Sequence, residues 1–184
     1  LQLCLGKPQE ALTTYTKWLD VVKPGRSHAW DTLYYGYADA LIAVGEAARA
    51  REWLTRVLQH PMLVAARDTT MRVSLEAQLA WAESECQATP LATERIQRLE
   101  RELANADQPL IVGFVHEVAA RIAHRARNEE QLSEQLSLMK RQYTLTRNQA
   151  LMARGQRVQD SFAEARPQAA VREDRDRVVT KVTT

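Results

Sequence analysis

The stretch of this sequence that comes nearest to metal chemistry is His116-Glu117-Val118-Ala119-Ala120. In a helical HExxH zinc site, a second histidine four residues after the first places both imidazoles on one face. Position 120 is alanine here, so that ligand is missing. His124 lies roughly on the same helical face as His116, but two histidines do not complete a four-coordinate site. The sequence therefore predicts no metal site, and we expect both histidines to line a polar groove or to make surface hydrogen bonds.

Nucleophilic and phosphate-binding chemistry also lacks its usual patterns. The sequence contains no GxSxG, no GxGxxG and no P-loop. Cys4 and Cys86 are far apart, form no CxxC pair and have no base nearby in the sequence, so we interpret them as small buried hydrophobic residues. We therefore expect a protein that is not an enzyme and that needs no cofactor.

The composition favours an all-α fold. Hydrophobic residues make up 45% of the 184 residues, and Gly and Pro number only six each. Strong helix formers dominate, and runs of β-branched residues alternating with polar ones are almost absent. The formal net charge of +2 does not by itself imply a nucleic-acid or membrane partner. No apolar run approaches the roughly 18 residues of a membrane span, and we expect a cytoplasmic location.

Residues 34–61 form the best-defined unit of the chain. Two amphipathic helical halves meet at a Val44-Gly45-Glu46 turn, and Pro61 closes the second half. Neither half could bury its apolar face alone. This pattern is typical of a unit that stacks on similar units to build a continuous core.

The same unit carries a family resemblance. Gly6-Lys7-Pro8-Gln9-Glu10-Ala11-Leu12-x-x-Tyr15 resembles the middle of a tetratricopeptide repeat (TPR), and so does Tyr34-x-x-Tyr37-Ala38-x-x-Leu41 followed by Gly45 and Ala50-x-x-x-Leu54. Ala38 and Ala50 match the two small residues at which paired helices of that family approach closely. Gly6 and Gly45 are 39 residues apart (45 − 6), against about 34 in the family. We attribute the excess to a longer loop around residues 23–27. The resemblance implies a right-handed helical-repeat solenoid over residues 1–128.

The resemblance also implies a binding face. In TPR proteins the first helix of each pair lines a concave groove that holds extended peptides or partner helices. In this register Tyr35 falls on that face with Thr32, Asp39 and Ile42. His116 and His124 fall on the equivalent face two units later, and Trp81 is a further candidate whose register is ambiguous. The alternative for Tyr35 is that it packs against a neighbouring repeat.

The uninterrupted helical composition of residues 129–166 predicts one long terminal helix. A heptad-like seam with alternating steps of four and three runs along it: Leu132, Leu136, Met139, Tyr143, Thr146, Ala150 and Ala153. Such a helix would cap the repeats or pair with a second copy of the chain as a coiled coil, giving a homodimer. Residues 156–166 resemble the linker that joins a TPR sensor region to an output domain in bacterial signalling proteins. The charged tail, residues 167–184, is expected to be disordered.

The sequence thus predicts a protein–protein interaction scaffold, or the sensory region of a bacterial signalling protein, with a peptide or helix in its groove. A first alternative is a nucleic-acid-linked regulator that uses the excess of basic residues in the C-terminal half. A second alternative is a purely structural oligomerisation segment. The nucleic-acid alternative is weaker, because these basic residues also fit an ordinary solvated helix face and only Tyr143 interleaves with them. They are Arg121, Arg125, Arg127, Lys140, Arg141, Arg147, Arg154 and Arg157.

Overall fold

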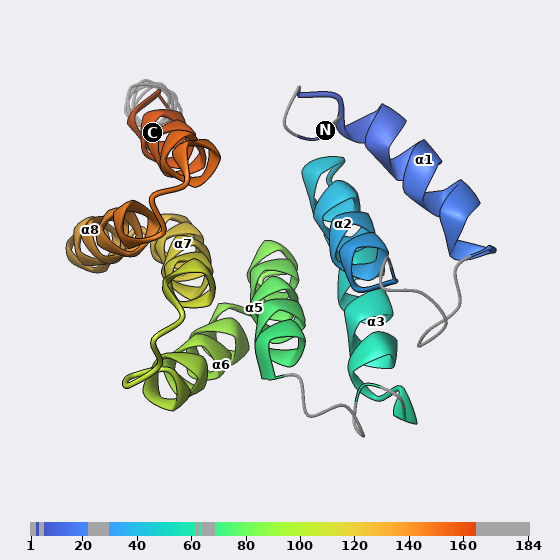
Figure 1. The fold of residues 1–184 in the computed structure, drawn as a ribbon, viewed down its shortest axis with the longest axis horizontal. Coiled ribbons are helices and arrows are strands. Elements are labelled where there is room, and N and C mark those ends of the chain that lie inside the picture. The colour runs from blue at the N-terminus through green and yellow to red at the C-terminus, as the bar shows by residue number, and fades with distance from the viewer. Residues whose placement is uncertain (1–2, 4–5, 22–29, 62, 64–68, 165–184) are drawn as a thin grey trace, which may run out of the picture.

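The structure is a computed structural model that describes residues 3, 6–21, 30–61, 63 and 69–164 of the chain. Within these ranges all regular secondary structure is helical, so the all-α prediction is confirmed (Figure 1). The tail over residues 167–184 and the loop around 23–27 lie outside the described residues. The helices are α1 (Pro8–Leu19), α2 (Trp30–Ala43), α3 (Ala47–Leu58), α5 (Thr69–Glu85), α6 (Thr89–Glu102), α7 (Pro109–Arg125) and α8 (Glu129–Leu145), followed by a C-terminal helix over residues 149–164.

Three helical hairpins, α2–α3, α5–α6 and α7–α8, share one kind of turn. Each turn contains a residue in the left-handed region, namely Gly45 (φ 83°), Gln87 (φ 65°) or Arg127 (φ 56°). The next residue donates its N–H to the carbonyl five residues earlier, as in Glu46 to Leu41 at 2.8 Å and Asn128 to Ala123 at 2.9 Å. This is the bond that ends a helix in a Schellman motif. The left-handed residues are 42 (87 − 45) and 40 (127 − 87) residues apart, so the long spacing predicted from Gly6 and Gly45 extends along the chain.

Small residues allow the helices to approach closely. Ala38 and Ala50 are completely buried, in agreement with their predicted role. The ring of Tyr15 on α1 lies directly over Gly36 on α2, where an added Cβ would be 2.5 Å from the ring. Three overlapping hydrophobic clusters follow one another from α1 to the C-terminal helix, and the partly buried Trp81 on α5 packs against the first two of them. Each hairpin therefore buries its apolar face against its neighbours.

The single long helix predicted over residues 129–166 is wrong. Helix α8 ends at Leu145, Arg147 adopts a left-handed φ of 53°, and a new helix begins at residue 149. The hydroxyl of Thr146 accepts the N–H of Asn148 at 3.1 Å, and the Asn148 Oδ1 accepts the N–H of Ala150 at 2.9 Å. Short polar side chains such as these form hydrogen bonds with nearby backbone N–H groups, which offers the backbone an alternative to the bonds of a continuing helix.

This break also changes the predicted heptad seam. Its first half, including Leu132, Met139 and Tyr143, is buried within the chain, mostly against α7. Its last two members, Ala150 and Ala153, are exposed. The C-terminal helix instead turns Val158 and Phe162 inward. The seam is therefore part of the core of one chain and does not form a continuous stripe for a second copy.

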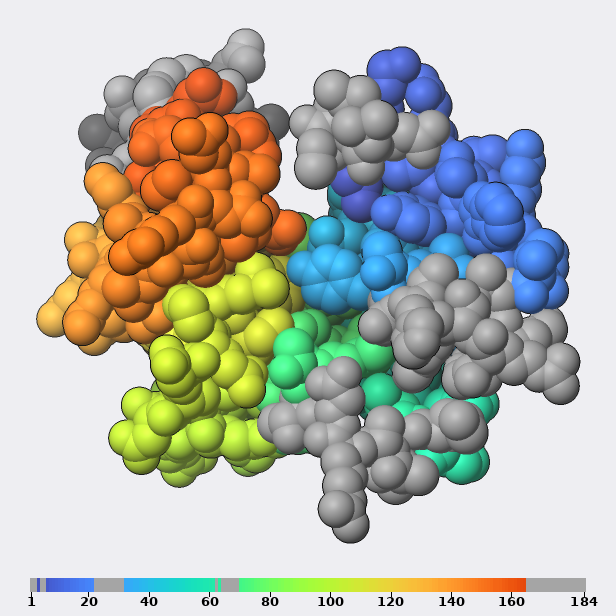
Figure 2. Space-filling model, in the orientation of Figure 1, coloured from blue at the N-terminus to red at the C-terminus, as the bar shows by residue number. Residues whose placement is uncertain are grey.

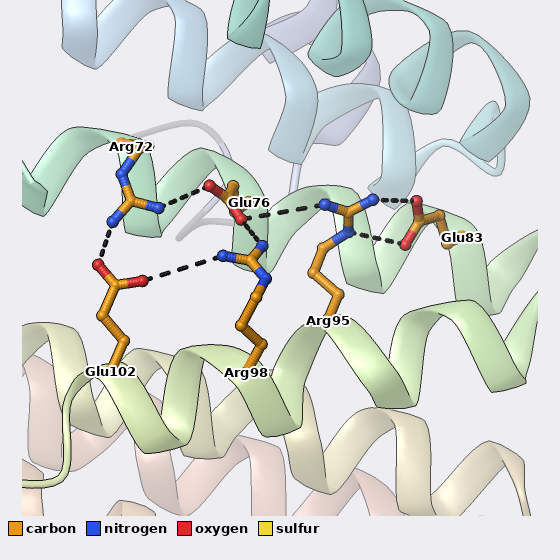
Figure 3. Close-up of polar contacts among 6 residues, drawn as sticks. All are labelled: Arg72, Glu76, Glu83, Arg95, Arg98 and Glu102. Carbon is orange, nitrogen blue, oxygen red and sulfur yellow. Dashed lines mark hydrogen bonds and ion pairs between the residues drawn. The ribbon is translucent and has the colours of Figure 1, made fainter. Parts of the chain in front are cut away.

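An ion-pair network joins α5 to α6 (Figure 3). Glu76 pairs with Arg72 at 2.7 Å and with Arg98, and Arg72 also pairs with Glu102. Glu83, almost fully buried, accepts two bonds from Arg95, at 3.0 and 2.8 Å. Burial would raise the pKa of Glu76, but Arg98 and Arg72 outweigh it and hold that pKa below its ordinary value. These pairs fix the α5–α6 hairpin.

Among the described helices, none combines the length and the apolar character required to cross a membrane.

Candidate binding cleft

A cleft of about 550 Å³ lies between the beginning and the end of the described chain. One wall is formed by α2 and by N-terminal residues that include Leu3 and Tyr15. The C-terminal helix forms the opposite wall, and Trp81 of α5 and Arg121 of α7 complete the lining. The space-filling view shows a hollow between the C-terminal helix and the N-terminal half of the molecule (Figure 2).

Helix α2 contributes three of the predicted binding residues to this cleft: Thr32, Tyr35 and Asp39. Their spacing of three and four residues places them on one helical face. The rings of Tyr35 and of Phe114 on α7 pack in a T-shaped arrangement, with ring centroids 5.5 Å apart. Tyr35 therefore lines the cleft and packs against a neighbouring hairpin at the same time.

Gln78 of α5 fixes this face of α2. Its Nε2 donates to the Tyr35 carbonyl at 3.0 Å and to the Asp39 carboxylate at 3.2 Å. Burial raises the pKa of Asp39, although the nearby Arg154 charge acts in the opposite direction. Burial likewise raises the pKa of Tyr35, so its phenol stays protonated. The α2 side of the cleft therefore offers hydrogen-bonding groups. Burial disfavours the negative charge of its one named carboxylate, Asp39.

Beneath the opposite wall, the buried carboxylate of Glu117 joins three helices. It accepts two bonds from Arg154 of the C-terminal helix, at 2.8 and 3.0 Å, and one from Arg121 at 2.9 Å. The Tyr143 hydroxyl of α8 donates to it at 2.8 Å. Burial alone would raise the pKa of Glu117, but the two guanidinium groups outweigh it and hold the pKa below its ordinary value. Glu117 is therefore ionised and fixes Arg154 at the edge of the cleft.

The Tyr143 ring lies between two glycines. A Cβ added at Gly113 of α7 would lie 2.7 Å from the ring, and one added at Gly155 of the C-terminal helix would lie 3.2 Å from it. A side chain at Gly113 would overlap the ring, and one at Gly155 would crowd it, so both helices approach α8 closely at these positions. This packing aims the Tyr143 hydroxyl at Glu117 and sets the position of the C-terminal wall.

Three arginines supply the charge of the cleft. Arg121 lies over the Trp81 ring, with its guanidinium carbon 4.4 Å from the ring centroid. Arg154 is committed to Glu117. Arg157, one turn further along the C-terminal helix, is exposed and makes no ion pair or side-chain hydrogen bond with any residue the structure describes. The cleft thus presents cations on the side formed by α7 and the C-terminal helix.

Three other predicted binding residues do not line the cleft. Ile42 is buried in the core formed by α1, α2, α3 and α5. His116 contacts the Gln135 side chain of α8 at 2.7 Å and lies 3.5 Å from Glu100 of α6. His124 stacks on Phe162 with ring centroids 4.5 Å apart. The face of α7 that meets the cleft is the one carrying Arg121. The two histidines instead contact α6, α8 and the C-terminal helix.

Sequence reasoning missed Gln78 and Glu117 as organising residues. The available signal for Glu117 was a carboxylate within an apolar stripe that includes Phe114 and Val118, which predicts a buried partner. Arg121, Arg154 and Arg157 were noted only as members of a basic set. Within that set, Arg121 and Arg154 pair with Glu117, and Arg125 pairs with Glu85 at 2.6 Å, so the set does not act as one free basic surface. In the ranges that the structure describes, no group of three or more His, Cys, Asp or Glu residues could hold a metal ion.

No protein-family model, no curated protein and no solved structure matches this chain.

Proposed function

We propose that this chain is a helical-repeat interaction module that holds a peptide or a helix of a partner protein in the cleft between α2 and the C-terminal helix. The observation that carries the proposal is the convergence of Thr32, Tyr35, Asp39 and Trp81, from two separate helices, on one cleft. The TPR resemblance implies a place on the inner face for Thr32, Tyr35 and Asp39, and offers Trp81 as a further candidate of ambiguous register. A TPR-like solenoid, with first helices lining its inner face, is the architecture that this proposal assumes.

The chemistry of the cleft supports recognition of a polypeptide. It combines an aromatic surface at Trp81 and Tyr35 with hydrogen-bonding groups at Thr32 and Asp39 and cations on the facing wall. Aromatic and arginine side chains are the residues that most often dominate the binding energy of protein interfaces. Grooves with such anchors hold extended or helical segments. The module would act as a scaffold or as the sensory part of a regulatory protein.

A selection from a random dodecapeptide display library on the immobilised protein tests this proposal. We expect specific peptides to be enriched and to lose binding to Ala43→Trp, because Ala43 is exposed and lines the cleft at the end of α2. The matched control is Ala48→Trp, at an exposed position on α3 outside the cleft lining. Absence of enrichment, or equal binding by both variants, would refute the proposed site.

A further inference from the structure

The charged groups at the cleft do not cancel. Three guanidinium groups line it, from Arg121, Arg154 and Arg157, and Asp39 is the carboxylate among the lining residues. The carboxylate of Glu117, behind the wall, takes two bonds from Arg154 and one from Arg121. Counting both carboxylates as ionised still leaves one positive charge. Protonation of the half-buried Asp39, whose pKa is raised by burial, would increase that excess.

Two of the arginines retain unused donors. A guanidinium carries five N–H groups. Arg121 gives one bond to Glu117, and 24% of its side-chain surface remains exposed. The Arg157 side chain has no partner in the described part of the chain, and it lies on the cleft wall next to Val158. Both arginines line the cleft, and hydrogen bonds from a charged guanidinium to a carboxylate are stronger than those between neutral groups.

We propose that the occupant of the cleft is an acidic peptide segment, whose side-chain carboxylates pair with Arg157 and Arg121 beside the Trp81 ring. This inference rests on the proposed function and specifies the class of peptide that the cleft selects. Carboxylates match the planar fork of a guanidinium, so Arg157 and Arg121 discriminate acidic from amide side chains. Charge complementarity of this kind also speeds association and rejects basic segments.

The test uses the peptides recovered from the display selection. The most enriched peptide is synthesised with an amidated C-terminus, so that only side chains carry negative charge, and a second copy has every Asp and Glu replaced by Asn and Gln. We expect the enriched pool to be rich in Asp and Glu. The amide copy should bind at least about tenfold more weakly in fluorescence polarisation at low salt, because a tenfold change needs only about 1.4 kcal/mol.

Arg157→Glu should weaken the acidic peptide by about tenfold or more, since it places a like charge opposite the ligand. The matched control, Arg141→Glu, changes an exposed arginine of α8 outside the cleft lining and should alter binding less than twofold. An enriched pool of neutral or basic peptides that still loses binding to Ala43→Trp would overturn the acidic-ligand inference and leave the proposed function standing. An acidic peptide indifferent to Arg157→Glu would also overturn it. A selection that enriches nothing would overturn both.

Discussion

At the residue scale, the buried carboxylate of Glu117 is the centre of the polar contacts between the C-terminal helices. Glu117 is completely buried, and its partners Arg121, Tyr143 and Arg154 come from α7, α8 and the C-terminal helix. A buried ion pair adds little net stability compared with an apolar replacement of the whole group, but removing one partner leaves uncompensated charge. The arrangement therefore acts mainly to specify where Arg154 and its helix lie.

Glu117→Ala should lower the free energy of unfolding by about 3–5 kcal/mol, because it leaves two arginines and a buried hydroxyl without their acceptor. Urea denaturation followed by circular dichroism measures the loss. Glu134→Ala, at an exposed glutamate on α8, serves as the control and should change stability by less than about 0.5 kcal/mol. Equal effects of the two substitutions would show that the buried network carries no stability.

The depressed pKa of Glu117 predicts how this contribution depends on pH. Its stabilisation is fully present above the ordinary value of 4.5 and is lost as the pH falls through the lower value of the folded state. The difference in unfolding free energy between the wild type and Glu117→Gln should therefore shrink between pH 7 and pH 3. A difference that stays constant over this range would contradict the assignment.

Asp39 should behave in the opposite way. Burial raises its pKa above the ordinary value of 3.8, so the ionised form is disfavoured in the folded state at neutral pH. Asp39→Asn keeps an oxygen that can accept the Gln78 N–H. We expect this variant to have a higher melting temperature than the wild type at pH 7, with the gain disappearing as the pH falls below 3.8. A lower melting temperature at pH 7 would mean that the charge of Asp39 is stabilising.

At the scale of the elements, the end of α8 is where the structure differs from the helix that the sequence pattern predicts. Helical composition continues past residue 147 to about residue 166, and periodicity alone therefore favours one helix. The structure ends α8 with Arg147 in a left-handed conformation, and the Asn148 side chain caps the next helix. The signal was present in Thr146 and Asn148, whose side chains compete with helical hydrogen bonds.

Arg147→Gly distinguishes a left-handed break at this position from a continuous helix, because the two predict opposite changes in the free energy of unfolding. Glycine adopts a left-handed conformation without the cost of about 1 kcal/mol that other residues incur there, so we expect a stability gain approaching that size. In a continuous helix the same substitution would cost about 1 kcal/mol. Asn148→Ala should cost about 1 kcal/mol through loss of the cap. Both values come from urea denaturation.

The Gly113–Tyr143 contact gives a second prediction at this scale. Gly113→Ala should destabilise by about 1–3 kcal/mol, because the new methyl group overlaps the Tyr143 ring. The cost should largely vanish in a Tyr143→Leu background, where the ring is absent. A double-mutant cycle measures the coupling. A cost that is equal in both backgrounds would place the clash elsewhere.

At the scale of the whole molecule, the sequence predicted the helical class, the buried Ala38 and Ala50, and three of the four α2 residues assigned to the cleft face, Ile42 being the exception. These features follow from helical periodicity and from small residues at hairpin contacts. The sequence could not place His116 and His124, because the rotation of α7 depends on tertiary partners such as Gln135 and Phe162. It also could not pair Glu117 with Arg154, which are 37 residues apart. Long-range polar pairing leaves no local pattern.

The burial of the heptad seam predicts the oligomeric state. Leu132, Met139 and Tyr143 are covered within one chain, so a second copy is not needed to bury them. We expect light scattering to give the monomer mass of 20.9 kDa. A dimer that persists after Leu132→Ser would identify an interface other than the seam.

The central claim is that the cleft between α2 and the C-terminal helix is the binding site. An NMR titration of the ¹⁵N-labelled protein with the most enriched peptide tests it directly. The chain has four tryptophans, and the indole signal of Trp81 is identified by its loss in Trp81→Phe. We predict that this signal and the amide signals of Thr32 and Arg157 shift, while the indole signal of the exposed Trp18 on α1 does not. An unchanged Trp81 signal, with shifts confined to other surfaces, would contradict the account.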